Sequence, residues 1–158
     1  MKIGVISDTH LSEPSDEFRE IISLHFKEAD IILHAGDVVE KRVLEAFLDY
    51  DLRAVSGNMD STEIKSILPP KQIIKTDKFK IGLIHGWGGH SGLEKKIITE
   101  FKDVDCIVFG HTHSPVNHII DDVLFFNPGA LANRWHKGNG SLGFLELSDT
   151  IKGTIIKV

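Results

Sequence analysis

The chain has 158 residues, of which 41% are hydrophobic and 26% charged, the size and composition of one ordinary globular domain. Its 18 Lys and Arg residues against 23 Asp and Glu residues leave a formal net charge of −5, and the basic clusters are only pairs, so binding to extended nucleic acid is not expected. No apolar run approaches the roughly 20 residues that span a bilayer, and the single Cys106 has no disulfide partner within the chain. We therefore expect one domain over residues 1–158, without membrane partners, in the cytoplasm; association into a homo-oligomer stays open.

Short apolar runs rich in β-branched residues predict ten strands, several of them covered on both faces. In chain order they are residues 2–7, 30–35, 52–56, 72–76, 79–85, 105–109, 116–120, 123–127, 141–147 and 151–158.

Three segments between these strands have helical periodicity. An apolar stripe runs from Phe18 to Phe26, a shorter one covers residues 43–48, and a third covers residues 93–101. Ser91 is placed to cap the third helix, and Glu94 completes the spacing of a capping box. Because strands and helices alternate in the first half, it is expected to form parallel strands with right-handed crossovers. The last 45 residues contain no helical pattern and predict an antiparallel meander.

Polar side chains collect where five predicted strands end. The carboxyl ends of strands in an open α/β sheet share one edge, where ligands bind, so five loops are expected to bring these side chains together. The set is Asp8, His10, Asp37, Asn58, His85, His111 and His113. Glycines precede Asp37, Asn58 and His111, which permits sharp turns there.

Seven such groups exceed what one tetrahedral ion uses. Oxygen and nitrogen donors without a thiolate suit Mn, Fe(II), Ni or Zn, and two ions that share a bridging carboxylate account for the whole set. A single His or Asp after a strand is more often a hydrogen-bonding or turn residue. Five such loops in one chain favour a metal centre.

The order of these motifs, D-x-H, G-D, G-N, H and G-H-x-H, resembles that of the calcineurin-like metallophosphoesterase superfamily. The similarity runs from Ser7 to His113, and the later segment 127–130, Asn-Pro-Gly-Ala, resembles the family's N-P-G-[SA] turn. Within the superfamily the chain is similar to the small single-domain branch that includes the Vps29-like proteins. The resemblance implies an α/β fold, a four-layer α/β/β/α sandwich of two mixed sheets with a dinuclear site along one edge.

By the same resemblance, each of two divalent ions is held by four residues, and Asp37 bridges them. The first set is Asp8, His10, Asp37 and His113; the second is Asp37, Asn58, His85 and His111. Asp37, Asn58 and His85 count as catalytic as well. Mn²⁺ is favoured, with Ni²⁺, Fe²⁺ and Zn²⁺ as alternatives.

The expected activity is hydrolysis of small phosphate esters by a metal-bound hydroxide, with diesters favoured. A phosphomonoesterase is the alternative enzyme. A non-catalytic Vps29-like scaffold that binds a protein partner is the alternative of another class.

The proton donor to the leaving group is unassigned. Many larger members of the superfamily carry histidine directly after the G-N asparagine, and this chain has Met59, whose thioether donates no proton. Asp60 is expected to orient a ligand imidazole rather than to act as the acid. His34 has either that kind of supporting role or a buried structural one.

Four further residues are interpreted as non-functional. His25 belongs to the amphipathic stripe of the first helix, and His90, Arg134 and His136 are read as solvated loop residues.

Overall fold

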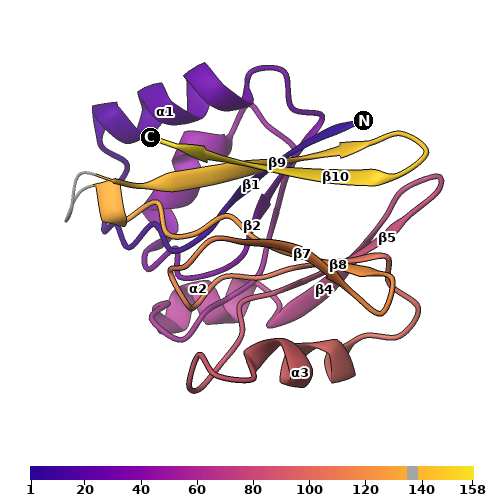
Figure 1. Cartoon of the computed structure of the whole chain (residues 1–158). Coiled ribbons are helices and arrows are strands. Elements are labelled where there is room, and N and C mark those ends of the chain that lie inside the picture. Colours follow the sequence, from indigo (N-terminus) through magenta and orange to yellow (C-terminus); the bar gives the residue numbers. More distant parts are fainter. Residues whose placement is uncertain (135–138) are drawn as a thin grey trace.

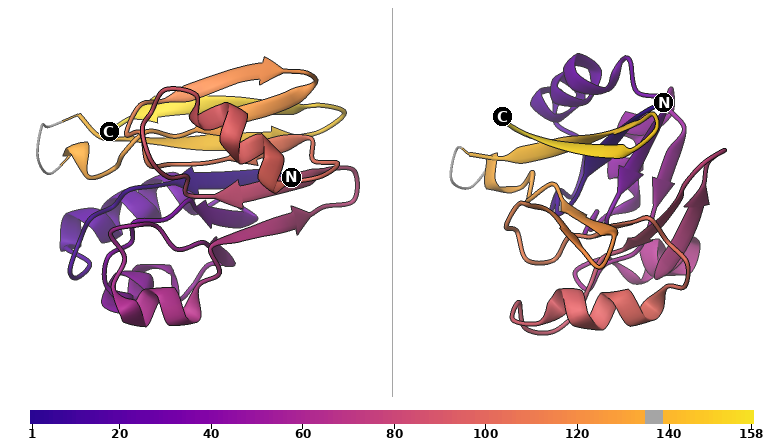
Figure 2. Two further views of the ribbon diagram at one scale, coloured as in Figure 1. Left: turned by 90° about the horizontal axis from the view of Figure 1, so that it is seen from below. Right: turned by 45° about the vertical axis from the view of Figure 1, so that its right-hand side comes forward.

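The computed structural model describes residues 1–134 and 139–158. Within them, strands form two five-stranded sheets, ordered β10-β9-β1-β2-β3 and β4-β5-β6-β8-β7. The sheets stack face to face, α1 covers the outer face of the first and α3 that of the second (Figures 1 and 2). The expected four-layer α/β/β/α architecture of two mixed sheets is confirmed.

The first sheet contains β1 (Lys2–Ile6), β2 (Ile31–His34), β3 (Leu52–Ala54), β9 (Ser141–Leu147) and β10 (Ile151–Lys157). Strand β1 pairs in parallel with β2, and β2 with β3, whereas β9 is antiparallel to both β1 and β10.

The second sheet contains β4 (Lys71–Lys75), β5 (Lys80–Ile84), β6 (Cys106–Val108), β7 (Val116–Ile120) and β8 (Val123–Asn127). Strands β5, β6 and β8 are parallel neighbours, and the outer strands β4 and β7 are antiparallel to β5 and β8. All ten predicted strands are present, with ends shifted by two residues or fewer.

The helical elements are α1 (Asp16–Phe26), α2 (Thr62–Ile67) and α3 (Leu93–Ile97), with 3₁₀-helices η1 (Lys41–Phe47) and η2 (Ile98–Glu100). Ser15 caps α1, because its side chain accepts a hydrogen bond of 3.1 Å from the Phe18 N–H. No helix in the described part of the chain is both long and apolar enough to cross a membrane.

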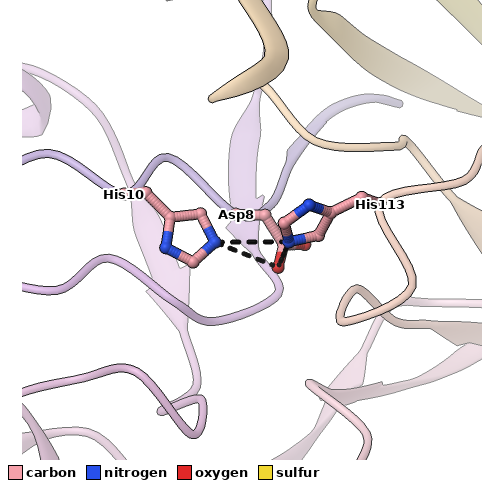
Figure 3. A group of neighbouring side chains, drawn as sticks. All are labelled: Asp8, His10 and His113. Atoms are coloured by element: carbon pink, nitrogen blue, oxygen red, sulfur yellow. Dashed lines mark hydrogen bonds and ion pairs between the residues drawn. The ribbon is translucent and has the colours of Figure 1, made fainter. Parts of the chain in front are cut away.

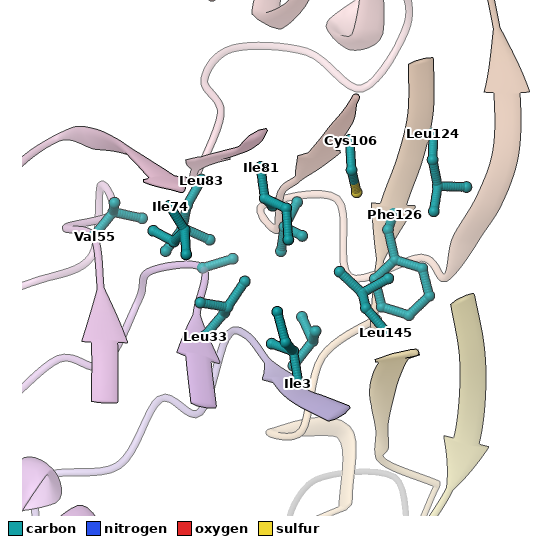
Figure 4. Close-up of a cluster of buried hydrophobic side chains, with 13 residues drawn as sticks. Ile3, Leu33, Val55, Ile74, Ile81, Leu83, Cys106, Leu124, Phe126 and Leu145 are labelled. Atoms are coloured by element: carbon teal, nitrogen blue, oxygen red, sulfur yellow. The ribbon is translucent and has the colours of Figure 1, made fainter. Parts of the chain in front are cut away.

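Alternation along the strands divides the apolar side chains between two layers of the interior. In β1, Ile3 and Val5 pack between the sheets, whereas Ile6 packs under α1 and η1. In β5, Ile81 also points inward, toward the same inter-sheet cluster, which Figure 4 shows between strands of both sheets. The central strands of each sheet are therefore buried on both faces, which explains their nearly continuous apolar character, whereas β7 and β10 keep exposed side chains.

Two glycines let aromatic rings lie directly on the outer faces of the sheets. A Cβ at Gly4 would lie 2.5 Å from the ring of Phe26 in α1, and a Cβ at Gly82 would lie 2.9 Å from the ring of Phe101 after η2. No side chain fits between strand and ring at either position, and the close approach fixes the depth at which these segments pack.

The secondary structure differs from the sequence-based expectations at four points. The predicted meander is instead two hairpins in different sheets, β7–β8 and β9–β10, because the chain crosses from one sheet to the other after β8. Residues 133 and 134 are helical, although no helix was expected there, and α2 was not predicted.

The predicted capping box of the third helix is the other error. The N-cap of α3 is Gly92, in the left-handed region at φ 71°, with no side-chain capping bond. Glu94 reaches across to His118 instead, with Oε2 3.1 Å from Nε2. The glycine makes the entering turn by itself, so Ser91 has no capping role.

Candidate metal centre

The predicted ligand residues follow the carboxyl ends of β1, β2, β3, β5 and β6, and these ends meet at one edge of the two sheets. The Asp8 N–H donates to the Gly36 carbonyl at 3.0 Å, which joins the loops after β1 and β2. The Gly110 N–H donates to the His85 carbonyl at 3.1 Å, which joins the loops after β5 and β6. The loops after β1 and β6 can lie this close because residue 110 is glycine, since a Cβ there would collide with Ser7 Oγ.

Five of these residues have a left-handed backbone, which is uncommon for residues other than glycine. They are Asp8, His10, Asp37, His111 and His113, with φ between 47° and 67°. Such conformations cost about 1–3 kcal/mol each and cluster at functional sites. The turns hold the five side chains toward a common centre.

Asp8, His10 and His113 form the first group of converging donor atoms (Figure 3). Asp8 Oδ1 lies 3.1 Å from His113 Nε2 and 3.7 Å from His10 Nε2, and the two Nε2 atoms are 3.3 Å apart. Among the buried side-chain nitrogen and oxygen atoms of the described residues, Asp8 Oδ1 alone makes no hydrogen bond. A fully buried carboxylate oxygen that makes no hydrogen bond and faces two imidazole nitrogens is suited to bind a cation.

The other oxygen of Asp8 is held by the protein. Ser7 Oγ donates to Oδ2 at 2.5 Å, and the His111 N–H donates to it at 3.1 Å. These two bonds fix the orientation of the carboxylate and leave Oδ1 facing the two imidazoles.

Asp37 lies between the two groups of donors. Its Oδ1 accepts a hydrogen bond of 2.7 Å from the Met59 N–H. Its Oδ2 lies 3.7 Å from His10 Nε2 on one side and 3.3 Å from His85 Nε2 on the other. One carboxylate oxygen therefore faces a histidine of each predicted ligand set.

Asn58, His85 and His111 form the second group. Asn58 Oδ1 is 3.2 Å from His85 Nε2 and 3.0 Å from His111 Nδ1. The remaining ring nitrogen of each histidine is bound to a backbone carbonyl, His85 Nδ1 to Ala35 at 2.7 Å and His111 Nε2 to Gly88 at 2.7 Å. These carbonyls select the tautomers that direct a lone pair toward Asn58 and Asp37.

The spacing of the donor atoms matches that of ligands on a common ion. Two ligands at about 2.1 Å from one metal are about 3.0–3.4 Å apart at octahedral or tetrahedral angles. Most of the donor separations in the two groups lie between 3.0 and 3.3 Å. Those of His10 to the two carboxylates, at 3.7 Å, are longer.

The electrostatics favour bound cationic charge. Burial would raise the pKa of Asp8 and of Asp37, but the neighbouring imidazoles outweigh it and hold both below the ordinary value. Burial would lower the pKa of His85, yet the carboxylates of Asp37 and Asp8 raise it; Asp8 also raises the pKa of His113. Both carboxylates are therefore ionised at neutral pH and stabilise positive charge between them.

Asp60 does not orient an imidazole, which corrects the prediction. Its Oδ1 accepts a hydrogen bond of 2.6 Å from the Val39 N–H, and its Oδ2 accepts one of 2.6 Å from the Gly57 N–H. It thereby ties the loop of Asp37 to the loop of Asn58. With both oxygens bound and the residue only 4% exposed, Asp60 is not placed to protonate a leaving group.

His34 and Met59 complete the surroundings of these loops. His34 is fully buried, with Nδ1 accepting from the Gly36 N–H at 3.2 Å and Nε2 3.3 Å from Thr9 Oγ1, so it supports the loops without joining the donors. Met59 is 58% exposed and contributes its backbone N–H to Asp37.

The four residues interpreted as non-functional lie outside both donor groups or outside the described residues. Arg134 pairs with Glu17, Nε to Oε1 at 2.9 Å, and His25 lies half-buried on α1. His90 is exposed, with its ring centroid 6.2 Å from that of His111. His136 lies outside the described residues.

Sequence reasoning missed the groups that support the centre. Asn127 Nδ2 donates to the Gly110 carbonyl at 2.8 Å and to Thr112 Oγ1 at 3.1 Å, which anchors the turn that carries His111 and His113. The resemblance of segment 127–130 to the family's N-P-G-[SA] turn is a sequence signal for such a role. No sequence pattern could have predicted that the carbonyls of Ala35 and Gly88 bind the two histidine rings, because every residue has a backbone carbonyl.

The chain is similar to a known family of proteins over most of its length. The model of the calcineurin-like phosphoesterase superfamily domain matches residues 1–150. The chain is 37% identical over 134 residues to the "Probable metallophosphoesterase MJ0623" of Methanocaldococcus jannaschii, covering 82% of this chain and 68% of that protein. It is 33% identical over 143 residues to the "Phosphodiesterase MJ0936" of the same organism, covering 82% and 83%.

Solved structures show the same fold. A structurally and functionally characterised archaeal phosphodiesterase superposes with a TM-score of 0.77 at 27% identity, over 100% of both chains. Vps29 of Chaetomium thermophilum superposes with a TM-score of 0.75 over 99% of this chain and 96% of that one, at 18% identity. With the family model matched over nearly the whole chain, this protein belongs to the calcineurin-like phosphoesterase superfamily.

Proposed function

We propose that the protein is a phosphodiesterase that depends on two divalent metal ions. The observation that carries the proposal is the position of Asp37 Oδ2, which faces His10 Nε2 at 3.7 Å and His85 Nε2 at 3.3 Å, between the two groups of donor atoms. A shared carboxylate is the element by which paired metal sites fix the separation of their ions.

The two ligand sets follow from these groups. Asp8, His10, Asp37 and His113 hold the first ion, and Asp37, Asn58, His85 and His111 hold the second. Asn58 is a neutral ligand, so the only negative charges among the seven residues are those of the two carboxylates. The two divalent ions therefore keep a net positive charge, which attracts a phosphate.

Bound divalent ions supply Lewis acidity and a water of lowered pKa at such a site. The protein itself holds the ligand atoms in place and leaves the solvent side of the centre open. Asn58 is exposed and His113 is partly exposed, whereas Asp8 and Asp37 are buried beneath them. A phosphate ester can therefore approach the centre from the solvent side, opposite the carboxylates.

Mn²⁺ is the metal we favour, because imidazole, carboxylate and amide donors without a thiolate suit it, with Ni²⁺, Fe²⁺ and Zn²⁺ as alternatives. The preference for diesters is supported by the relative named phosphodiesterase at 33% identity and by the similarity to the archaeal phosphodiesterase structure. A diester places one anionic oxygen at the centre while its second ester group points away. A monoesterase is the alternative.

A scaffold function like that of Vps29 is the alternative of another class, because the fold is shared with Vps29. The presence of all seven ligand-type residues in converging positions favours the enzyme.

The experiment that tests the proposal compares Asp37→Ala with Asn58→Ala. The parent, purified without chelator and loaded with Mn²⁺, should contain two ions per chain by elemental analysis and hydrolyse bis(p-nitrophenyl) phosphate faster than p-nitrophenyl phosphate. Asp37→Ala should lose metal and activity far more severely than Asn58→Ala, because it removes a ligand from both ions.

Asp149→Ala is the matched control. This exposed carboxylate pairs with Lys78 near the N-terminus, at the opposite edge of the sheets, and its removal should change neither metal content nor rate. Saturation of the parent at one ion, or Asp37→Ala retaining most of its activity with two ions bound, would contradict the dinuclear assignment. A higher rate with the monoester would favour the monoesterase.

A further inference from the structure

A cavity of about 460 Å³ adjoins the candidate metal centre on the side of Asn58 and His85, both of which line it. Beyond these two residues, the walls include Pro70, Ile84 and Trp87. Its volume is that of a site for a small organic group. A phosphate at the centre would thus have one ester group beside a partly apolar cavity.

Trp87 is the one aromatic ring of a Phe, Tyr or Trp among the described lining residues, and it is 43% exposed. A large aromatic side chain that is partly left in solvent forgoes part of the stabilisation of burial, which for full burial of an aromatic ring amounts to about 1.5–3 kcal/mol. Among the described residues, Trp87 belongs to none of the three hydrophobic clusters of the fold, so its apolar surface does not serve the core.

The backbone nevertheless holds Trp87 in a defined place. His85, two residues before it, is anchored by the bond from Nδ1 to the Ala35 carbonyl at 2.7 Å. Gly88, directly after it, is anchored because its carbonyl is 2.7 Å from His111 Nε2. The glycines on either side have φ of 102° and 78°, so the segment makes a turn that other residues adopt only with strain. The same histidines that face the candidate metals thus position the tryptophan.

The charge of the cavity wall narrows the chemistry of the occupant. Lys71 and Glu100 both line the cavity, and Lys71 Nζ is 2.6 Å from Glu100 Oε2. Among the described lining residues, Lys71 is the single Lys or Arg, and its charge is already paired. The cavity therefore offers no unpaired ammonium or guanidinium to bind a second phosphate. An uncharged flat group could instead pack against the aromatic face of Trp87.

We propose that Trp87 is a specificity residue that stacks against an aromatic ester group of the phosphodiester, so that the enzyme prefers aromatic over aliphatic esters. The inference rests on the proposed function, because it assigns the substrate class of that same site. Stacking on an exposed aromatic side chain is worth about 5- to 150-fold in affinity for a base-sized ring.

The test compares two phosphonates that the enzyme cannot cleave, p-nitrophenylphosphonate and methylphosphonate, as inhibitors of diester hydrolysis by the Mn²⁺-loaded protein. The parent should bind the aromatic phosphonate at least about 5-fold more tightly. Trp87→Phe should keep most of this preference, and Trp87→Ala should lose it. Leu48→Ala, at an exposed apolar residue that does not line the cavity, is the control and should match the parent.

A second readout does not depend on catalysis. The chain has two tryptophans, Trp87 and Trp135, and nitroaromatic rings quench tryptophan fluorescence on contact. p-Nitrophenylphosphonate should quench the parent in a saturable way, and the saturable part should be absent in Trp87→Phe even though that variant still binds.

An unchanged preference in Trp87→Ala, or equal saturable quenching in the parent and Trp87→Phe, would overturn the role of Trp87 and leave the phosphodiesterase assignment standing. Absence of diester hydrolysis in the metal-loaded parent would overturn the proposed function, and this inference with it.

Discussion

His34 offers a stability test that is independent of metals and substrates. It is fully buried, Nδ1 accepts a hydrogen bond from the Gly36 N–H, and Nε2 faces Thr9 Oγ1. Burial lowers its pKa from 6.5 to about 4. Between these two pH values the unfolded chain binds a proton at His34 that the folded chain does not.

The sign follows from this difference in bound protons. Because the unfolded state binds the additional proton, the free energy of unfolding falls as the pH is lowered from 6.5 toward 4. The full difference between the two pKa values corresponds to about 3 kcal/mol. That is a large part of the total stability of a typical domain.

The assay is urea unfolding at a series of pH values from 7 to 4, with chelator present so that release of metal by protonated histidines does not contribute. His34→Asn keeps a side-chain oxygen able to accept from the Gly36 N–H and removes the titrating ring. The readout is the difference in pH dependence between the parent and the variant, because other groups titrate in both. His25→Gln, at a half-buried histidine on α1, controls for loss of an imidazole elsewhere.

We expect the parent to lose about 3 kcal/mol more than His34→Asn across this range. Identical pH dependence in the two proteins would refute the argument, since it would mean that His34 is protonated in the folded state as readily as in the unfolded one. A steeper loss in His34→Asn would refute it as well.

Three further predictions concern other residues. Asp60→Asn should destabilise the fold by about 1.5–3 kcal/mol in urea unfolding and weaken Mn²⁺ binding about 10- to 100-fold, because a carboxylate that accepts two backbone N–H bonds is lost; unchanged metal affinity would contradict its positioning role. In a leaving-group series of p-nitrophenyl and alkyl diesters, the parent should depend steeply on leaving-group pKa, by about 10²–10⁴-fold, and Met59→His should flatten this dependence; a shallow dependence in the parent would show that another group donates the proton. Burial raises the pKa of the Cys106 thiol, with a smaller contribution from Asp105, so Ellman's reagent should label Cys106 only after unfolding; rapid labelling of the native chain would contradict its burial between the sheets.

The sequence by itself determined the strands and the set of residues at the site. Strand positions were predicted within two residues because period-two alternation and short apolar runs are local properties of the chain. Convergence of the seven donors was predictable because parallel strands expose their carboxyl ends at one edge. The glycine before Asp37 and the glycine before His111 were local signals of turns that the structure shows with positive φ.

Tertiary structure alone decided how the strands divide between two sheets and what each donor faces. The meander was predicted wrongly because β8 and β9 are consecutive strands whose partners, β6 and β1, lie far away in sequence. The capping box of α3 was predicted wrongly because the N-cap is Gly92 rather than Ser91, and the Glu94 side chain contacts His118 of β7 instead. Pairing energies between distant segments override local spacing in such cases.

The supporting bonds of the centre depend on contacts that no sequence pattern encodes. The tautomers of His85 and His111 are selected by the carbonyls of Ala35 and Gly88, and Asp60 bonds to backbone N–H groups rather than to an imidazole. Residue types at a spacing indicate which atoms can bind a metal. Only the folded backbone, which brings donors and acceptors from separate loops within hydrogen-bonding distance, decides which of those atoms are already bound and which remain free for a ligand.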